Sequence, residues 1–229
     1  MQTIHSENFA QDAARFIVEQ GTRSIQERGV FRIALSGGST PRKVFEALAK
    51  CSGALPWTKV QFTFGDERCV GPDDPQSNFR MARESLFDPA QVPPASILRM
   101  RGELPAEQAA AEYEAALLQL STPLEEARYR HDLVLLGMGD DGHTASLFPD
   151  TTALQETERN VVANFVPKLN TERITFTYPL INAARHVAFL VGDRSKHPIV
   201  ERVWAGEFPA SKVQPEEGCL TWILGYAAQ

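Results

Sequence analysis

Apolar side chains recur along this chain in two patterns, one typical of amphipathic helices and one typical of buried strands. Near the N-terminus they follow helical spacing and predict a helix that begins near the candidate N-cap Ser6, with one face made by Phe9, Ala13, Phe16, Ile17 and Ile25. Six short apolar or β-branched runs predict strands: VFRIALS, KVQFTFG, HDLVLLGMG, RITFTY, HVAFLVG and CLTWILG.

Helical segments separate most of these runs. TPRKVFEALAK has Thr40 as a candidate N-cap and Pro41 at the first helical position. Further helices are expected in NFRMARESLF, PAEQAAAEYEAALLQL, PLINAA and PIVERVWAG. Strands of near-continuous apolar character between helices favour an α/β fold whose mostly parallel sheet is covered on both faces. The chain contains neither repeats nor linker-like stretches, so residues 1–229 are expected to form a single domain.

Composition narrows the classes of partner. The 23 basic and 29 acidic residues give a net charge of −6, which argues against nucleic acid or an anionic membrane as the ligand. No segment approaches the roughly 20 apolar residues of a membrane span, and the first residues do not resemble a signal peptide. The three cysteines form no CxxC pair, which favours a reducing compartment. We therefore expect a cytoplasmic protein, a monomer by default.

The first candidate site is the turn between the VFRIALS strand and the following helix. Gly37 and Gly38 allow backbone N–H groups to converge on an anion, and Ser39 and Thr40 add hydroxyl donors at a helix N-terminus. These features suit a phosphate group. A plain tight turn with a helix cap is the alternative. The segment matches neither GxxxxGK[ST] nor GxGxxG, so nucleoside triphosphates and dinucleotides are not expected.

Charged residues follow other strands. The segment from Gly65 through Asp66 and Glu67 to Arg68 comes directly after KVQFTF, and Ser77 and Asn78 follow at some distance. Charges at the end of a buried strand are costly unless they are paired or bind a ligand. A structural Asp–Arg pair is the alternative. Arg173 and Lys196 lie at the RITFTY and HVAFLVG strands and suit oxyanion binding, although either also fits an exposed surface position.

The segment GMGDDGHTASLFP carries the most specific pattern. It places Asp140, Asp141, Gly142 and His143 in a turn after a strongly apolar strand and before an expected short helix. Histidine suits a general base near neutral pH. The acids are alternatively metal ligands, helix caps or groups that orient the imidazole. No HxH or HExxH spacing accompanies them, so a metal is not expected.

Together these segments resemble, in order, the signature segments of the 6-phosphogluconolactonase family, which shares its fold with glucosamine-6-phosphate deaminases. The matching segments are ALSGGSTPRKVFEAL, FTFGDERCVGPDDPQSNFRMARESLF, DLVLLGMGDDGHTASLFP and RITFTYPLINAARHVAFLVGDRSK. The resemblance implies a Rossmann-like, doubly wound fold. It also implies hydrolysis of 6-phosphoglucono-δ-lactone, an intermediate of the oxidative pentose phosphate pathway, with neither metal nor organic cofactor.

The resemblance also implies roles for individual residues. His143 would activate water, supported by Asp141 and Gly142, while Asp66 and Arg68 would line the sugar and the reacting carbonyl. The phosphate would be held by Gly37, Gly38, Ser39, Thr40, Arg173 and Lys196. The chain lacks a GxSxG nucleophile elbow, which favours direct attack by water over an acyl-enzyme.

Two alternatives stay open at this point. A glucosamine-6-phosphate deaminase or isomerase would carry a catalytic glutamate after its GHTA-like segment, where this chain reads ASLFPD. A non-catalytic sugar-phosphate-binding protein would keep the glycine turn but would have no need of the His143 cluster.

Overall fold

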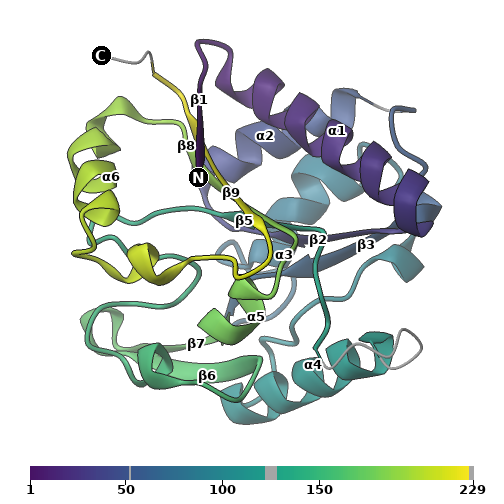
Figure 1. Ribbon diagram of the computed structural model, residues 1–229. Helices are drawn as coiled ribbons and strands as arrows, with labels where there is room; N and C mark the ends of the chain where they lie inside the picture. The colour runs from purple at the N-terminus through teal and green to yellow at the C-terminus, as the bar shows by residue number, and fades with distance from the viewer. Residues whose placement is uncertain (52, 122–127, 227–229) are drawn as a thin grey trace.

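In the computed structural model, which describes residues 1–51, 53–121 and 128–226, the main feature is a six-stranded sheet (Figure 1). Its strand order is β1-β9-β8-β5-β2-β3, and every pairing is parallel. The strands are β1 (Gln2–His5), β2 (Phe31–Leu35), β3 (Val60–Phe64), β5 (Leu133–Leu136), β8 (His186–Val191) and β9 (Cys219–Leu224). This architecture confirms the expected α/β, Rossmann-like fold.

Alternate residues of the central strands point into two separate cores. Ile33 and Leu35 of β2 face α1 (Phe9–Arg28), α2 (Ser39–Lys50) and α3 (Asn78–Ala82), whereas Ala34 between them belongs to the opposite core. That second core includes α4 (Ala106–Ser121), α5 (Tyr178–Asn182) and α6 (His197–Trp204). Both faces of the sheet are therefore covered, which explains why its strands read as continuous apolar runs.

A smaller antiparallel sheet lies on the α4 side of the molecule (Figure 1). It pairs β7 (Thr171–Phe176) with both β6 (Val161–Val166) and β4 (Asp66–Arg68). The sequence patterns did not reveal β4 or β6, and they also missed β1. The RITFTY strand therefore lies outside the parallel sheet, and the acidic segment after β3 is a short strand rather than a loop.

Two expected helix starts are wrong. Helix α1 begins at Phe9 rather than near Ser6, because Ser6 is hydrogen-bonded to the end of β9 through its N–H and to Asp12 through its hydroxyl. Helix α2 begins at Ser39 with Gly38 as its N-cap, so Thr40 lies within the first turn. No helix among the described residues combines the length and apolar character needed to cross a bilayer.

Candidate active site

A pocket of about 470 Å³ opens at the carboxyl ends of β2, β5 and β8, beside the antiparallel sheet. In doubly wound folds this edge of the sheet is the usual ligand site. The structure brings nearly all of the expected site residues to its lining: Gly37, Gly38, Ser39, Thr40, Asp66, Arg68, Asp141, His143, Arg173 and Lys196. Gly142 is the exception, since it lies buried behind the lining.

The glycine turn forms one wall of the pocket. Gly38 adopts a φ of 104°, a conformation that a side chain would strain, and the chain then enters α2 directly. The first N–H groups of a helix have no partner within the helix, and the helix dipole favours negative charge there. Ser36 fixes the base of the turn by accepting a hydrogen bond from the N–H of Gly137, at 3.1 Å. The wall is therefore suited to an anion.

Lys196 reaches the pocket from the turn that follows β8. Its Nζ donates to the backbone oxygen of Met138 at 2.7 Å and lies 2.9 Å from a carboxylate oxygen of Asp140. The Asp140 side chain is 86% exposed, so water competes strongly for its charge. Lys196 is thus held in place by a backbone group and remains available to a second anion.

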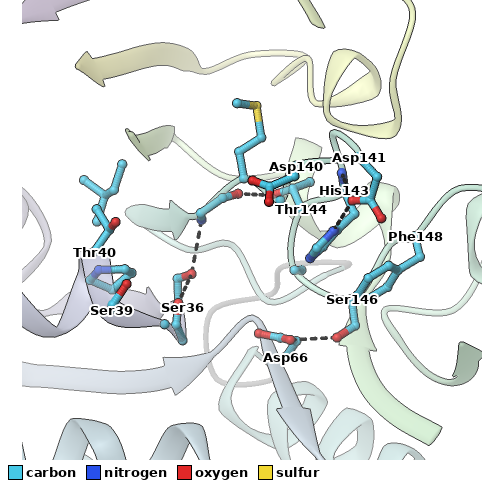
Figure 2. A pocket seen from close by; sticks show the side chains of 18 of the residues that line it. Ser36, Ser39, Thr40, Asp66, Asp140, Asp141, His143, Thr144, Ser146 and Phe148 are labelled. Atoms are coloured by element: carbon cyan, nitrogen blue, oxygen red, sulfur yellow. Dashed lines mark hydrogen bonds and ion pairs between the residues drawn. The ribbon is translucent and has the colours of Figure 1, made fainter. Parts of the chain in front are cut away.

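His143 stands across the pocket from Ser39 and Thr40 (Figure 2). Its Nδ1 lies 2.5 Å from Oδ1 of Asp141, and its ring stacks on Phe148 with 3.8 Å between centroids. The other carboxylate oxygen of Asp141 accepts from Lys168 Nζ at 2.8 Å. Burial raises the pKa of Asp141, but hydrogen bonds from Lys168 and His143 outweigh burial and hold that pKa well below its usual value. Since an ionised carboxylate only accepts, Nδ1 carries the proton and Nε2 is the basic nitrogen.

The turn that carries His143 is closed by its own backbone. The N–H of Gly139 donates to the carbonyl of His143 at 2.9 Å, and Gly142 adopts a φ of 68° with its Cα against Phe208. The short helix expected after this turn is absent, because an isolated bridge between Thr144 and Leu147 follows instead. Of the roles considered for the acids, Asp141 therefore contacts the imidazole and caps no helix there.

Asp66, Arg68 and Arg173 line the side of the pocket that the antiparallel sheet forms. Arg68 on β4 lies directly opposite Arg173 on β7. Burial lowers the pKa of the Arg173 guanidinium, and the neighbouring Arg68 lowers it further. Two like charges at opposed positions destabilise a sheet unless an anion lies between or beside them. Among the described residues no ion pair joins Asp66 to Arg68, since Asp66 accepts from Ser146 and Asn78 and Arg68 donates to the backbone oxygen of Gln76. The purely structural pair considered above therefore does not form.

The sequence patterns missed Lys168, Phe148 and Ser146 as site residues, and they indicated Asn78 without showing what it contacts. Lys168 comes from the β6–β7 connection and contacts Asp141, while Phe148 supports the imidazole. Ser146 and Asn78 both donate to the carboxyl group of Asp66. Ser146 and Asn78 stand inside the family-like segments, but nothing in their local spacing indicates which side chain they contact.

The acids of the turn are engaged by cations and by the imidazole. In residues 1–51, 53–121 and 128–226, no three His, Cys, Asp or Glu side chains gather in a way that could hold a metal ion. Asp140 faces Lys196, and Asp141 faces Lys168 and His143. Metal-independent chemistry stays a prediction.

Known proteins resemble this chain over nearly its whole length. A 6-phosphogluconolactonase from Synechocystis sp. is 44% identical over 214 residues, which are 90% of this chain and 87% of the relative. One from Haemophilus influenzae is 35% identical and covers 96% of this chain and 95% of its own. The crystal structure of 6-phosphogluconolactonase from Thermotoga maritima superposes with a TM-score of 0.85 at 27% identity, covering 97% of this chain and all of that one.

The family model for glucosamine-6-phosphate isomerases/6-phosphogluconolactonase matches residues 5–222. That span includes the glycine turn, the Asp66–Arg68 strand, the His143 turn, Arg173 and Lys196. The chain therefore belongs to the glucosamine-6-phosphate isomerase/6-phosphogluconolactonase family.

Proposed function

We propose that this protein hydrolyses 6-phospho-D-glucono-1,5-lactone to 6-phospho-D-gluconate, with His143 as the general base. The observation that carries the proposal is the His143–Asp141 pair across one pocket from a helix N-terminus and cationic side chains. Relatives named 6-phosphogluconolactonase support the choice of substrate, including one that is 44% identical. The reaction belongs to the oxidative pentose phosphate pathway.

The chemistry needs few parts. Nε2 of His143 takes a proton from water while the water oxygen attacks the lactone carbonyl. The tetrahedral intermediate then collapses, the bond between the carbonyl carbon and the ring oxygen breaks, and the ring oxygen leaves as a hydroxyl after it receives the proton that Nε2 of His143 took from water. The product acid releases one proton to solvent. Asp141 holds the imidazole in the tautomer that this sequence requires.

Water attacks directly in this scheme, without an acyl-enzyme. The hydroxyl of Ser146, a serine of the pocket lining, donates to Asp66 at 2.7 Å rather than to His143. Arg68 and Arg173 lie side by side where negative charge on the carbonyl or on the phosphate would be stabilised. Gly37, Gly38, Ser39, Thr40, Lys196 and Arg173 are assigned to the phosphate, and Asp66 and Arg68 to the sugar and the reacting carbonyl.

Proton release after addition of freshly prepared 6-phosphogluconolactone tests the proposal directly, with glucosamine 6-phosphate as the competing substrate. His143→Ala should lower kcat by about 10²- to 10⁴-fold, the usual contribution of a general base, and leave KM nearly unchanged. His5→Ala is the matched control, because His5 is exposed on β1 outside the pocket. A His143 variant with wild-type kcat would remove this residue from the mechanism.

The proposal includes catalysis without a metal by a cytoplasmic monomer. Dialysis against EDTA should leave kcat unchanged, and size-exclusion chromatography with light scattering should give the mass of one 25.4 kDa chain. If EDTA abolished activity and a divalent ion restored it, Asp140, Asp141 and His143 would have to be reassigned as ligands.

A further inference from the structure

The carboxyl group of Asp66 is held from two sides by neutral donors. Ser146 Oγ donates to Oδ2 at 2.7 Å, and Asn78 Nδ2 donates to Oδ1 at 3.1 Å (Figure 2 shows the first of these). Asp66 is buried, yet it lines the pocket. Each carboxyl oxygen has a second lone pair, so both can still accept from a ligand hydroxyl. The direction of those remaining lone pairs is set by Ser146 and Asn78.

Asn78 is itself firmly anchored. It is the first residue of α3 and is 1% exposed. Its N–H donates to Oε1 of Glu67 at 2.7 Å, and its Nδ2 also donates to the backbone oxygen of Asp66 at 2.9 Å. Both the backbone and the side chain of Asn78 are therefore tied to β4, so that Asn78 and Asp66 move together.

The other end of the Asn78 amide meets the glycine turn. Oδ1 of Asn78 is buried without a hydrogen-bond partner among the described residues. It lies against Gly37, where an added Cβ would be only 1.8 Å from Oδ1. The reverse orientation of the amide would turn its oxygen toward two acceptor oxygens of Asp66, so the hydrogen bonds determine which end faces Gly37. Asn78 is thus the spacer between β4 and the turn assigned to the phosphate.

We propose, on the basis of the function proposed above, that Asn78 is a positioning residue that fixes the Asp66 carboxyl group relative to the glycine turn. The phosphate is remote from the bond that breaks, and its binding helps catalysis only if the two ends of the pocket keep a fixed spacing. Through Asn78, a phosphate bound at the turn places the lactone in register with Asp66 and the reacting end. An unphosphorylated lactone has no phosphate to bind at the turn, so the spacing contributes little to its rate of hydrolysis.

The test compares Asn78→Ala and Asn78→Asp with wild type on 6-phosphogluconolactone and on unphosphorylated gluconolactone. Asn78→Asp keeps the shape of the side chain and loses the donor, whereas Asn78→Ala adds no charge. Both should lower kcat on the phosphorylated lactone at least about 10-fold, equivalent to about 1.4 kcal/mol of barrier. The rate on gluconolactone and the inhibition constant of inorganic phosphate should change much less.

Ser85→Ala is the matched control. Ser85 is a buried residue of the helical segment 83–87 after α3, and its Oγ donates to the backbone oxygen of Met81 at 2.7 Å, away from Asp66, Gly37 and the pocket lining. It should leave the ratio of the two lactone rates at the wild-type value. Equal loss on both lactones in the Asn78 variants, or phosphate inhibition that weakens in parallel, would show a merely structural role and overturn the proposal.

A crystal structure of each Asn78 variant separates this proposal from the proposed function. If wild type failed to hydrolyse the phosphorylated lactone, the function would be wrong irrespective of Asn78. The positioning role then rests on the variant structures, in which the Asp66 carboxyl group should rotate or the Gly37 backbone should shift relative to β4. Asp66 still bound to Ser146 and Gly37 unmoved would contradict the positioning role whatever the substrate.

Discussion

At the scale of single residues, the contact between Asp141 and His143 decides which nitrogen can act as a base. The 2.5 Å approach places a carboxylate on Nδ1 and leaves Nε2 as the basic nitrogen, with no hydrogen-bond partner among the described residues. Phe148 holds the ring plane from one face. The orientation of the imidazole is thus set before the substrate binds, so no free energy is spent on reorienting the ring during the reaction.

Replacing Asp141 by asparagine should therefore lower kcat by about 10²-fold or more while KM changes little, since an amide that donates to Nδ1 forces the wrong tautomer. Steady-state kinetics on 6-phosphogluconolactone measure the effect. Lys168→Ala is the control. Lys168 is 67% exposed, and an exposed ion pair contributes about 1 kcal/mol at most, so kcat should fall less than about 5-fold. Equal losses in the two variants would indicate that Asp141 acts mainly through its charge.

Most of the site residues predicted from the sequence line the pocket, but their contacts were not predictable. His143 was predictable because glycines and acids surround it after an apolar strand. The glycine turn was predictable because two glycines precede two hydroxyl residues at a helix start. Asn78 and Ser146 contact Asp66 across 12 and 80 residues of chain, and no local pattern encodes such distances.

At the scale of elements, the antiparallel sheet explains how Arg68 and Arg173 come together. β4 is only three residues long, and β6 carries a polar Asn164 among its apolar residues, so neither gives a strong strand signal. The pairing of β4 with β7 depends on β3 ending directly before it, with Gly65 between them. Each element boundary alone is ambiguous, whereas the register between the strands places the two guanidinium groups.

This pairing predicts stabilisation by phosphate. A ligand present at about 100 times its dissociation constant should raise the free energy of unfolding by about 2.7 kcal/mol. Arg173→Met should shrink that gain, because the bound anion loses its contact with the half-buried guanidinium. Arg194→Met is the control, since Arg194 is exposed outside the pocket. Thermal unfolding with and without inorganic phosphate or 6-phosphogluconate gives the measurement, and equal gains in wild type and Arg173→Met would remove Arg173 from the anion site.

At the scale of the whole molecule, the parallel sheet was largely predictable because its strands are buried on both faces. The sequences of β5 (LVLL) and β8 (HVAFLV) are almost entirely apolar, which indicates that both strands are buried. Strand order was not predictable, since it depends on which faces of distant helices pack together. The edge strand β1 was missed because it has four residues and only intermediate burial at its centre.

Stability of the whole fold depends on a histidine outside the pocket. His131 is fully buried, and its Nε2 lies 2.9 Å from Thr63 Oγ1. Thr63 Oγ1 donates to the backbone oxygen of Ile33, so it accepts from Nε2–H of a neutral imidazole. Burial, together with the smaller effect of the Arg32 charge, lowers the pKa of His131 from 6.5 to about 3.

Between those two pKa values the unfolded chain binds a proton at His131 that the folded chain does not, so stability should fall as pH drops from about 6.5 toward 3. The largest slope from one such group is about 1.4 kcal/mol per pH unit.

His131→Phe keeps a ring between Tyr129 and Phe176 and leaves Thr63 bonded to Ile33. Urea unfolding at pH 7.5, 6.5, 5.5 and 5 should give a shallower dependence for this variant. Burial also lowers the pKa of His186 and raises that of Glu67. Both groups are present in wild type and variant, so the difference between the two stability curves cancels their contributions. Parallel curves would mean that His131 accepts a proton in the folded protein.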